Sequence, residues 1–406
     1  MRILLLITEF SRGGALRVFR DQFCAFSSKY SVDQAVFSTA DNDTGSDSRL
    51  PHVLDRGTYF SYLGSVGRLL KRSIALNMLV RAQKYDVVIS HMDGANWVNA
   101  LSCSAAKKVL VVHGTVKHDR DTRSLVTLLR RWFIFPLLYN RAEKTIAVSD
   151  AIACELRSFG VKRVSSIPNF FRVNQIEKMA AEPLTANDAS IFEHPHVMVT
   201  SGRLAEQKQQ MQLIELQARL KARHVSARLV VLGDGPLREQ LIQRARSLNL
   251  TVFCTRDHGM SPADAADVYF LGWVKNPYKY LSKSTLFLFP SAWEGFPLAL
   301  CEALICRVAA LSSDCPTGPR EILAPGTRNS RYNLRNIEVA KNGVLLPIIQ
   351  SDHDLCRWAD ATEMLLNDEC LRDEITRSAA KQVKSLEWTL GVEKWVEMLE
   401  ELVEPK

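Results

Sequence analysis

The chain has 406 residues, of which 47% are hydrophobic and 24% are charged, as in an ordinary globular protein with sizeable cores. This length predicts two domains, and no apolar run reaches the roughly 18 residues that a membrane-spanning helix needs. The nine cysteines include no C-x-x-C pair, which argues against a zinc site and a disulfide scaffold and favours a cytoplasmic protein.

The net charge of +8 is concentrated in the first half of the chain. Residues 1–182 hold 26 Lys and Arg against 16 Asp and Glu, whereas the remaining residues hold 26 against 28. A basic domain indicates an anionic partner, such as a membrane surface, a phosphorylated glycan or nucleic acid. Because no aromatic-basic RNA-binding signature occurs, we do not expect nucleic acid.

Strands and helices alternate through the first half, which predicts a doubly wound parallel sheet. The segments expected to form strands are 2–7, 35–37, 86–90, 108–113 and 145–149, and helices are expected to end near 28 and to span 65–84, 120–144 and 151–159. Residues 173–195 are expected to form a linker to a second domain.

Two features of the first half are candidates for ligand contact. Gly13 and Gly14 follow the first strand, where a double glycine lets the backbone approach a ligand closely; without the G-x-G-x-x-G fingerprint, the pair by itself also fits a simple tight turn. His113 ends a predicted parallel strand, at the edge where α/β proteins bind ligands. A hydrogen-bonded structural histidine would give the same pattern.

The segment 120–144 interleaves arginines with aromatic residues such as Trp132 and Phe133. A basic amphipathic helix of this kind can lie on an anionic bilayer surface. The alternative is an ordinary helix that covers the sheet and exposes its arginines to solvent.

The second half opens with an apolar strand that leads into Gly202, Arg203 and, five positions later, Lys208. An Arg fork and a Lys point charge on one loop suit a diphosphate, whose charge they could neutralise without a metal. Two further strand-to-loop junctions follow, one with Gly233 and one with Val274.

The most informative stretch is Pro290-Ser-Ala-Trp-Glu-Gly-Phe-Pro-Leu-Ala-Leu-Cys-Glu-Ala-Leu304. An apolar strand precedes it and a helix is expected from about Leu298. A strand, a glycine turn and a helix N-terminus form an anion-binding geometry, because the first backbone N–H groups of a helix lack intrahelical acceptors. Glu294 and Glu302 place two carboxylates near that helix start.

This stretch resembles the E-x7-E signature of family 4 of the retaining, nucleotide-sugar-dependent glycosyltransferases. The resemblance extends over almost the whole chain and includes the Arg203–Lys208 pair. It implies the GT-B fold, an α/β fold with two Rossmann-like doubly wound domains facing across a cleft. The expected ranges are 1–180 for an acceptor-binding domain, 190–380 for a nucleotide-sugar domain, and 381–406 for a helix that packs back toward the first domain.

The resemblance also implies roles for the residues above. Glu294, His113, Arg203 and Lys208 are the expected catalytic residues. The residues expected to bind the donor are Gly13, Gly14, Arg203, Lys208, Gly233, Val274, Gly295, Phe296, Pro297, Leu298 and Glu302. Glu302 would bind ribose hydroxyls and Val274 would lie near the base.

The implied reaction transfers a hexose or N-acetylhexosamine from a nucleoside diphosphate sugar, with retention at the anomeric carbon. Among the possible bases of the donor, the resemblance favours uracil. The acceptor would be a glycan, a polyprenyl-diphosphate-linked glycan or lipopolysaccharide, as in bacterial surface polysaccharide synthesis. No cofactor and no metal are expected. The protein would be cytoplasmic, with contact to the inner face of the cytoplasmic membrane through its first domain.

Two alternatives stay open at this point. A UDP-sugar epimerase on the same fold would need no acceptor, and a membrane-surface binding protein would keep the fold without catalysis. Three D-x-D matches, beginning at Asp41, Asp119 and Asp352, would suit a metal-dependent transferase, but all lie in polar segments and are interpreted as solvated loops. The polar segment 325–341 has no assigned role.

Overall fold

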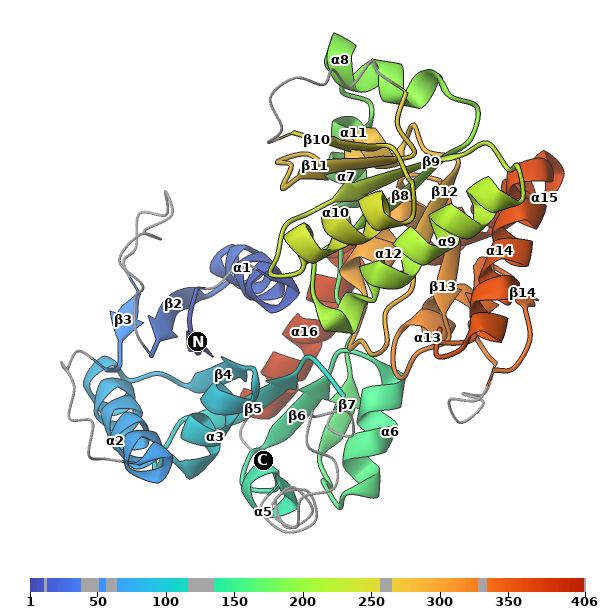
Figure 1. Ribbon diagram of the computed structural model, residues 1–406. Helices are drawn as coiled ribbons and strands as arrows, with labels where there is room; N and C mark the ends of the chain where they lie inside the picture. Colours follow the sequence, from blue (N-terminus) through green and yellow to red (C-terminus); the bar gives the residue numbers. More distant parts are fainter. Residues whose placement is uncertain are drawn as a thin grey trace. The chain divides into compact units, whose positions relative to one another are not determined.

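The computed structural model describes residues 1–10, 13–37, 51–55, 64–115, 135–255, 265–327 and 334–404. These residues divide into two compact units. Unit 1 comprises Met1–Phe170 and Thr389–Lys406, and unit 2 comprises Phe171–Trp388. Each unit is built on its own sheet (Figure 1).

The sheet of unit 1 has the strand order β3-β2-β1-β4-β5-β6-β7 in the described residues, and every pairing among these strands is parallel. Its strands are β1 (Arg2–Ile7), β2 (Ser31–Val36), β3 (His52–Val53), β4 (Val87–His91), β5 (Lys107–Val112), β6 (Lys144–Ala147) and β7 (Val164–Ser166). Its helices are α1 (Gly14–Ser27), α2 (Ser65–Gln83), α3 (Asp93–Leu101), α5 (Phe135–Tyr139), α6 (Asp150–Ser158) and most of α16 (Trp388–Val403).

The sheet of unit 2 has the order β10-β11-β9-β8-β12-β13-β15-β14, and only the β14–β15 pairing among the described strands is antiparallel. Its strands are β8 (Val197–Ser201), β9 (Arg228–Leu232), β10 (Val252–Cys254), β11 (Val268–Gly272), β12 (Leu286–Phe289), β13 (Ala309–Ser313), β14 (Glu338–Ala340) and β15 (Gly343–Leu346).

The described helices of unit 2 include several short helices and the 3-10 elements η2 and η3. They are α7 (Val173–Ala180), α8 (Ala186–Ala189), η2 (Ser190–Glu193), η3 (Glu206–Lys208), α9 (Gln210–Ala222), α10 (Arg238–Ser247), α11 (Tyr278–Leu281), α12 (Leu298–Ile305), α13 (Pro319–Leu323), α14 (Asp352–Asn367) and α15 (Glu369–Lys384).

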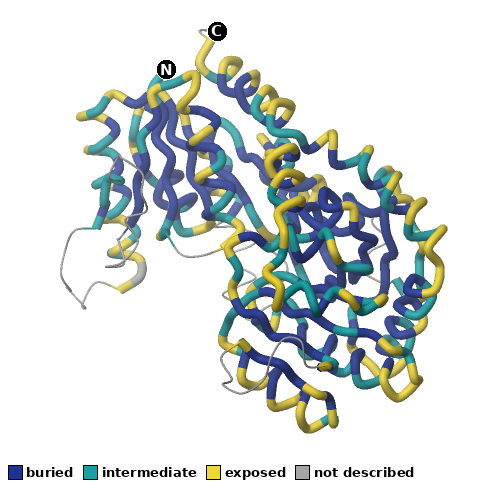
Figure 2. Tube along the Cα trace, turned by 90° about the horizontal axis from the view of Figure 1, so that it is seen from above, coloured by how far each residue is buried: buried dark blue, intermediate teal, exposed yellow. Residues whose placement is uncertain are grey.

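The strands form the core of each unit, as the dark segments in Figure 2 show. In β1, residues Ile3–Leu6 are fully buried, and in β12 residues Leu286–Leu288 are fully buried. A parallel strand is covered by helices on both faces and therefore reads as a continuous apolar run. This is why the sequence predicts an α/β fold with two parallel sheets, and the structure confirms that prediction.

Some predicted boundaries differ from those observed. Residues 173–195 form α7, α8 and η2 of unit 2 instead of an extended linker, and α7 packs by an amphipathic face that buries Val173, Ile176 and Ala180. In the segment 120–144, residues 116–134 lie outside the described residues; the helical part that is described ends at Tyr139, and Lys144 already begins β6.

The last helix, α16, belongs mainly to unit 1 although it comes from the far end of the chain. Trp395 on α16 is 1% exposed, and its ring lies 5.7 Å from that of Phe26 on α1. The hydroxyl of Tyr30 donates to the Glu400 carboxylate over 3.2 Å. Gly391 lets this helix approach closely, because a Cβ there would lie 2.3 Å from the Cβ of Phe170.

Gly391→Ala tests this close approach. Alanine is the better helix former by about 1 kcal/mol, but here its methyl group would overlap Phe170, so we expect a net loss of about 1–3 kcal/mol from overpacking. Urea unfolding of the full chain measures this loss, with exposed Lys394→Ala on the same helix as the control. Equal or greater stability of Gly391→Ala would contradict the packing described.

Candidate functional site

The loops that follow the strands of unit 2 converge at the carboxyl edge of its sheet. The strand order reverses direction between β8 and β12, which pair in parallel. Open α/β sheets bind ligands at such a switch point, beyond the carboxyl ends of the strands. The loop after β8 holds Arg203 and Lys208, and the loop after β12 holds Glu294.

Two glycines allow the loops after β8 and β9 to touch. The amide of Gly202 donates to Leu232 over 3.0 Å, and the amide of Gly233 donates to Gly272 over 2.7 Å. Gly233 has φ +134°, and a Cβ there would lie 1.9 Å from the carbonyl oxygen of Gly202. Because a side chain fits neither the backbone conformation nor the space, glycine is required at this position.

Lys208 and Glu294 form an ion pair across the switch point, with Nζ 2.6 Å from Oε1. The two loops are tied together beside this pair, since Gln207 donates its side-chain amide to Trp293 O over 2.7 Å and Ala292 N donates to Gln207 O over 2.8 Å. Glu294 is 6% exposed, whereas the Lys208 side chain is 22% exposed. The lysine side chain is therefore partly accessible, while the carboxylate fixes the position of its ammonium.

Arg203 lies on the same loop but is exposed, and no hydrogen bond or ion pair of its guanidinium occurs among the described residues. The backbone around it is fixed instead, because Gln210 donates to Arg203 O over 3.0 Å. A free guanidinium on a fixed backbone is a suitable donor for phosphate oxygens.

Glu302 lies on the first turns of α12 and is 6% exposed. Its Oε1 accepts a hydrogen bond from the Tyr278 hydroxyl over 3.1 Å. Tyr278 begins α11 and is 8% exposed. Tyr278 could not be selected from the sequence, because no spacing rule connects a tyrosine to a glutamate 24 positions later.

Residues Gly295 to Leu298 lead into α12, whose N-terminus carries no side-chain cap from the described residues. The preceding loop rests on the segment after β13: Glu294 N donates to Pro316 O over 3.3 Å, and the Thr317 hydroxyl donates to Glu294 O. Gly318 has φ +95°, and a Cβ there would lie 2.4 Å from Pro297 Cδ. The segment 316–318 therefore braces the backbone that carries Glu294.

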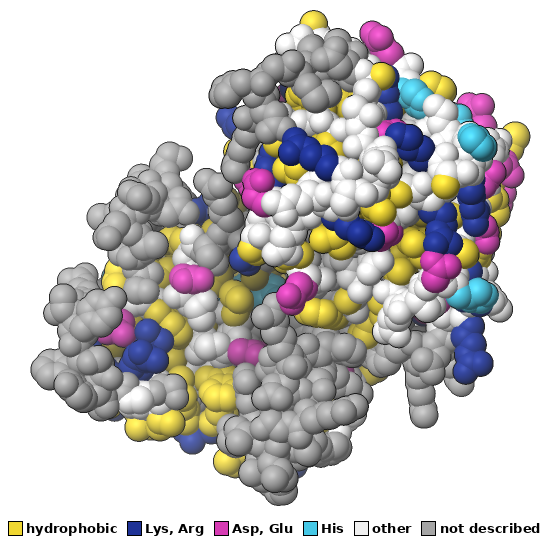
Figure 3. Space-filling model, in the orientation of Figure 1, with side chains coloured by type: hydrophobic (Ala, Val, Ile, Leu, Met, Phe, Trp, Pro, Cys, Tyr) yellow, Lys and Arg dark blue, Asp and Glu magenta, His cyan; other side chains and the backbone are white. Residues whose placement is uncertain are grey.

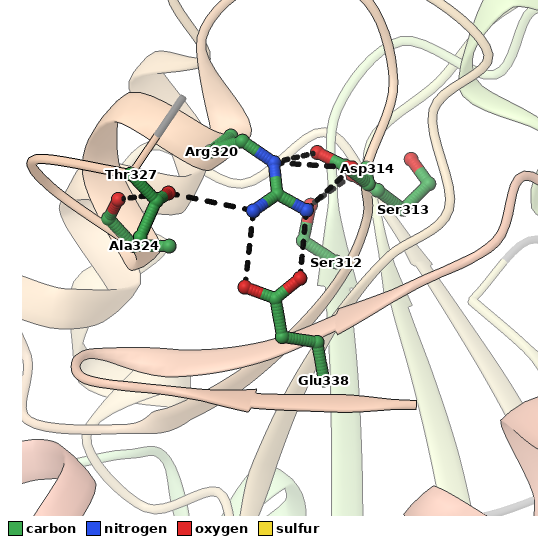
Figure 4. Close-up of polar contacts among 7 residues, drawn as sticks. All are labelled: Ser312, Ser313, Asp314, Arg320, Ala324, Thr327 and Glu338. Atoms are coloured by element: carbon green, nitrogen blue, oxygen red, sulfur yellow. Dashed lines mark hydrogen bonds and ion pairs between the residues drawn. The ribbon is translucent and has the colours of Figure 1, made fainter. Parts of the chain in front are cut away.

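A buried clamp holds this bracing segment in turn (Figure 4). Arg320 is 5% exposed and donates to both oxygens of Asp314, the shortest distance being 2.7 Å. It also donates to both oxygens of Glu338 in β14, over 3.0 and 2.8 Å. Glu338 gives a structural role to the described end of the segment 325–341, for which the sequence suggested none.

Val274 and the adjacent Trp273 follow β11, and Trp273 is 62% exposed. Asn276 in the same loop donates to Met179 O and to Glu182, both over 2.8 Å. These bonds fix the loop from its far side. The structure thus brings the predicted residues of the second domain onto neighbouring loops of one sheet edge.

The predicted residues of the first domain lie in unit 1. Gly13 is the exposed N-cap of α1 and Gly14 begins that helix. A Cβ at Gly13 would meet nothing within 4 Å, so close packing among the described residues does not require a glycine there. His113 follows β5 directly and contacts His91, the last residue of β4, which the sequence did not single out.

Among the described residues no group of three or more His, Cys, Asp or Glu side chains could hold a metal ion. The described D-x-D match lies at the start of α14, where Asp352 pairs with Arg219 and Asp354 accepts from Ser351 over 2.7 Å. Both carboxylates therefore have structural partners. The matches at Asp41 and Asp119 lie outside the described residues.

Arg320→Met tests the clamp. It removes the cation and leaves the buried Asp314 carboxylate without its ion pair, which costs about 3–5 kcal/mol in comparable buried pairs. Urea unfolding measures this cost. Arg219→Met is the matched control, because its partner Asp352 is 75% exposed and exposed pairs contribute about 0–1 kcal/mol. Equal losses in the two variants would contradict a special role for the clamp.

Known protein families and curated proteins show similarity to most of this chain. Residues 13–175 match the family model described as glycosyltransferase family 4, and residues 195–368 match the one described as glycosyl transferases group 1. An uncharacterized glycosyltransferase of Methanocaldococcus jannaschii is 30% identical over 270 residues. That alignment covers 64% of this chain and 63% of the relative, which is less than two thirds of its length.

Two further comparisons, one with a curated protein and one with a solved structure, cover 99% of this chain. The curated protein is an α-1,4-N-acetyl-D-galactosaminyltransferase of Campylobacter jejuni that is 23% identical, with 99% of both chains covered. Its name includes the substrate GalNAc-α-(1→4)-GalNAc-α-(1→3)-diNAcBac-PP-undecaprenol. The crystal structure of Anabaena HepE with UDP and glucose superimposes with a TM-score of 0.74, at 19% identity, over 99% of this chain and 100% of that one. The two family models match successive parts of the chain, and the chain belongs to the family 4 glycosyltransferases, with the GT-B fold.

Proposed function

We propose that this protein is a retaining glycosyltransferase that moves a hexose or N-acetylhexosamine from a UDP-sugar to a glycan acceptor, either lipid-linked or part of lipopolysaccharide. The observation that carries the proposal is the Lys208–Glu294 pair at the switch point of unit 2, with Nζ and Oε1 2.6 Å apart. It places a partly open ammonium and a buried carboxylate where an α/β sheet binds its ligand.

The donor diphosphate would be neutralised by this chain alone. Lys208 offers a point charge, Arg203 an exposed guanidinium, and the N-terminus of α12 its first backbone N–H groups. Preorganised positive groups aimed at the leaving charge lower the barrier of the transfer step. This arrangement supports a reaction that needs no metal and no cofactor besides the donor.

Glu294 and Glu302 would act on the sugar portions of the donor. Glu302, held by Tyr278, presents a carboxylate to the ribose hydroxyls, and Glu294 lies beside the departing phosphate, where it contacts the donor sugar or the positive charge that forms on it. With Lys208 as its partner, Glu294 is held in position as a carboxylate. Retention through attack on the same face would require no covalent nucleophile from the protein.

The acceptor proposal draws on the relatives. The full-length Campylobacter relative is named for a substrate linked to undecaprenol through a diphosphate. A substrate of that kind is anchored in a membrane, so an enzyme that uses it must work at the bilayer surface. We extend this substrate class to the present chain as part of the proposal.

A surface of unit 1 supports membrane contact. Val66, Leu70, Ile74 and Met78 on α2 are 67%, 51%, 61% and 66% exposed; their spacing of four places them along one face of the helix. We call this set the α2 stripe. No described helix is long and apolar enough to cross a bilayer, but a helix with such a stripe can lie in the interface.

The charge of α2 favours an anionic bilayer as the partner. Residues 65–84 contain five Lys and Arg and no Asp or Glu; the cations are Arg68, Lys71, Arg72, Arg81 and Lys84. Figure 3 shows hydrophobic side chains exposed beside Lys and Arg over α2. Apolar contact and attraction to anionic lipids together give stable interfacial binding. The helix 120–144, which the sequence suggested for this role, lies largely outside the described residues.

An epimerase remains the second candidate among enzymes, and a membrane-surface binding protein without catalysis is the candidate from another class. An epimerase needs no acceptor and would leave the α2 stripe without a role. A binding protein would not need the Lys208–Glu294 pair, the Tyr278–Glu302 contact and an unengaged Arg203 together at one sheet edge.

Calorimetric titration of the full chain with UDP, GDP and ADP tests the donor site. We expect one nucleotide, UDP, to bind without magnesium, and Arg203→Ala to weaken its binding by about tenfold, the scale of one charge-assisted hydrogen bond. Arg377→Ala, an exposed arginine on α15, is the control and should bind normally. Absence of binding by all three nucleotides would favour the non-catalytic alternative.

Co-sedimentation with vesicles tests the α2 stripe. Leu70→Glu with Ile74→Glu removes two apolar anchors and adds negative charge, so we expect binding to vesicles that contain anionic lipid to weaken by at least about tenfold. Leu390→Glu, at an exposed apolar position of α16, is the control. Unchanged binding of the double variant would exclude α2 as the membrane contact.

A further inference from the structure

Two histidines from neighbouring strands of unit 1 are in direct contact. His91 ends β4 and His113 follows β5, the next strand of the sheet. Nδ1 of His91 lies 2.9 Å from Nε2 of His113, and the rings are stacked with centroids 5.1 Å apart. His91 is 0% exposed. The pair therefore forms one hydrogen bond between two ring nitrogens.

Such a bond holds one proton. Burial lowers the pKa of His113 to about 4. Burial, and next the charge of His113, lower the pKa of His91 well below its ordinary value. Both rings are accordingly neutral near pH 7, and each neutral imidazole carries one N–H. Either His91 donates from Nδ1 or His113 donates from Nε2, and this choice fixes the tautomer of both rings.

The second nitrogen of His91 decides between the two arrangements. Nε2 of His91 is buried and has no hydrogen-bond partner in the described part of the chain. If His113 donated the hydrogen bond, His91 would carry its own proton on Nε2, as a buried donor without an acceptor. Buried donors without a partner are rarer in proteins than buried acceptors without one. Placing the proton of His91 on Nδ1 leaves only a lone pair unsatisfied.

The backbone beside His91 is held in an unusual conformation. Met92 has φ +71° and ψ +155°, a region that is populated almost entirely by glycine and costs about 1–3 kcal/mol for other residues. Strain of this size persists where the surroundings impose it, and it occurs preferentially at functional sites. It supports a turn that serves to orient the end of β4.

We infer that His91 is a positioning residue: it donates Nδ1–H to Nε2 of His113 and so keeps the proton of His113 on Nδ1. His113 then offers a hydrogen-bond donor, through its Nδ1–H, to an acceptor oxygen of a substrate. Its other nitrogen is occupied, so His113 orients an oxygen atom and does not remove a proton. The inference rests on the proposed function for the identity of the substrate, but its statement about the tautomer does not.

Nitrogen NMR of the full chain labelled with 15N-histidine tests the tautomer directly. The chain has nine histidines, and comparison with His113→Asn and His91→Asn identifies the two rings. Long-range proton–nitrogen correlations distinguish a protonated Nδ1 from a protonated Nε2. We expect His113 with Nδ1 protonated and Nε2 bare. The opposite tautomer at His113 would overturn the inference, whether or not the protein shows transfer activity.

Kinetics of two substitutions test the consequence for the reaction. His91→Leu removes the donor, so His113 should become a mixture of tautomers and kcat should fall about tenfold, as for one lost hydrogen bond, with KM for the donor little changed. His91→Asn places an amide near the position of Nδ1 and should restore most of kcat. Exposed His353→Leu is the control for loss of a histidine.

The outcomes separate the two proposals. An unchanged kcat in His91→Leu would overturn the positioning role, and failure of Asn to restore kcat in a folded variant would do the same. If the wild-type protein shows no transfer at all, the proposed function fails, while the tautomer of His113 in the resting protein still decides the inference about His91.

Discussion

The contact between Lys208 and Glu294 is the interaction on which the site of unit 2 depends. It joins the loops after the two strands that flank the switch point, and it couples a partly open ammonium to a carboxylate that is 6% exposed. A carboxylate so deeply buried needs a counter-charge, and the lysine provides it in the absence of ligand. The pair therefore ties the loop after β8 to the loop after β12.

The contacts that surround the Lys208–Glu294 pair explain how its position is maintained. Gly233 lets the loops after β8 and β9 touch, the segment 316–318 supports the backbone of Glu294, and Arg320 anchors that segment to β14. Unit 1 uses different chemistry at the equivalent edge of its sheet, where two neutral histidines face each other. One unit thus presents charge at its strand ends, and the other presents a hydrogen-bond donor.

Much of the fold and part of the site could be predicted from sequence, because their signals are local. Continuous apolar runs identify buried parallel strands, and Arg203, Lys208, Glu294 and Glu302 stand at fixed short distances from such strands. The contact of Tyr278 with Glu302, that of Arg320 with Glu338 and that of His91 with His113 could not be predicted in this way. Their partners lie between 18 and 24 positions away in the sequence, and only the packing of separate elements brings them together.

The predicted element boundaries that differ from the structure also depend on packing between separate elements. Residues 173–195 are polar enough to suggest a linker, yet a few apolar residues at helical spacing let α7 pack within unit 2. A helix as short as α7 has too few residues for its apolar periodicity to be recognised in the sequence. It is stabilised mainly by packing its apolar face against unit 2. The glycine at position 13, by contrast, is the N-cap of α1, where a Cβ would meet nothing within 4 Å, so its contact with a ligand stays a prediction of the resemblance.

The central claim is that the chain transfers a sugar to an acceptor. It is tested most directly by mass spectrometry of lipid-linked glycans after incubation with UDP-hexoses and UDP-N-acetylhexosamines in the presence of a chelator. We expect the glycan to gain the mass of one sugar, matched by released UDP, with the wild-type chain and not with Glu294→Gln. An unchanged glycan mass together with a converted UDP-sugar would contradict it and identify an epimerase.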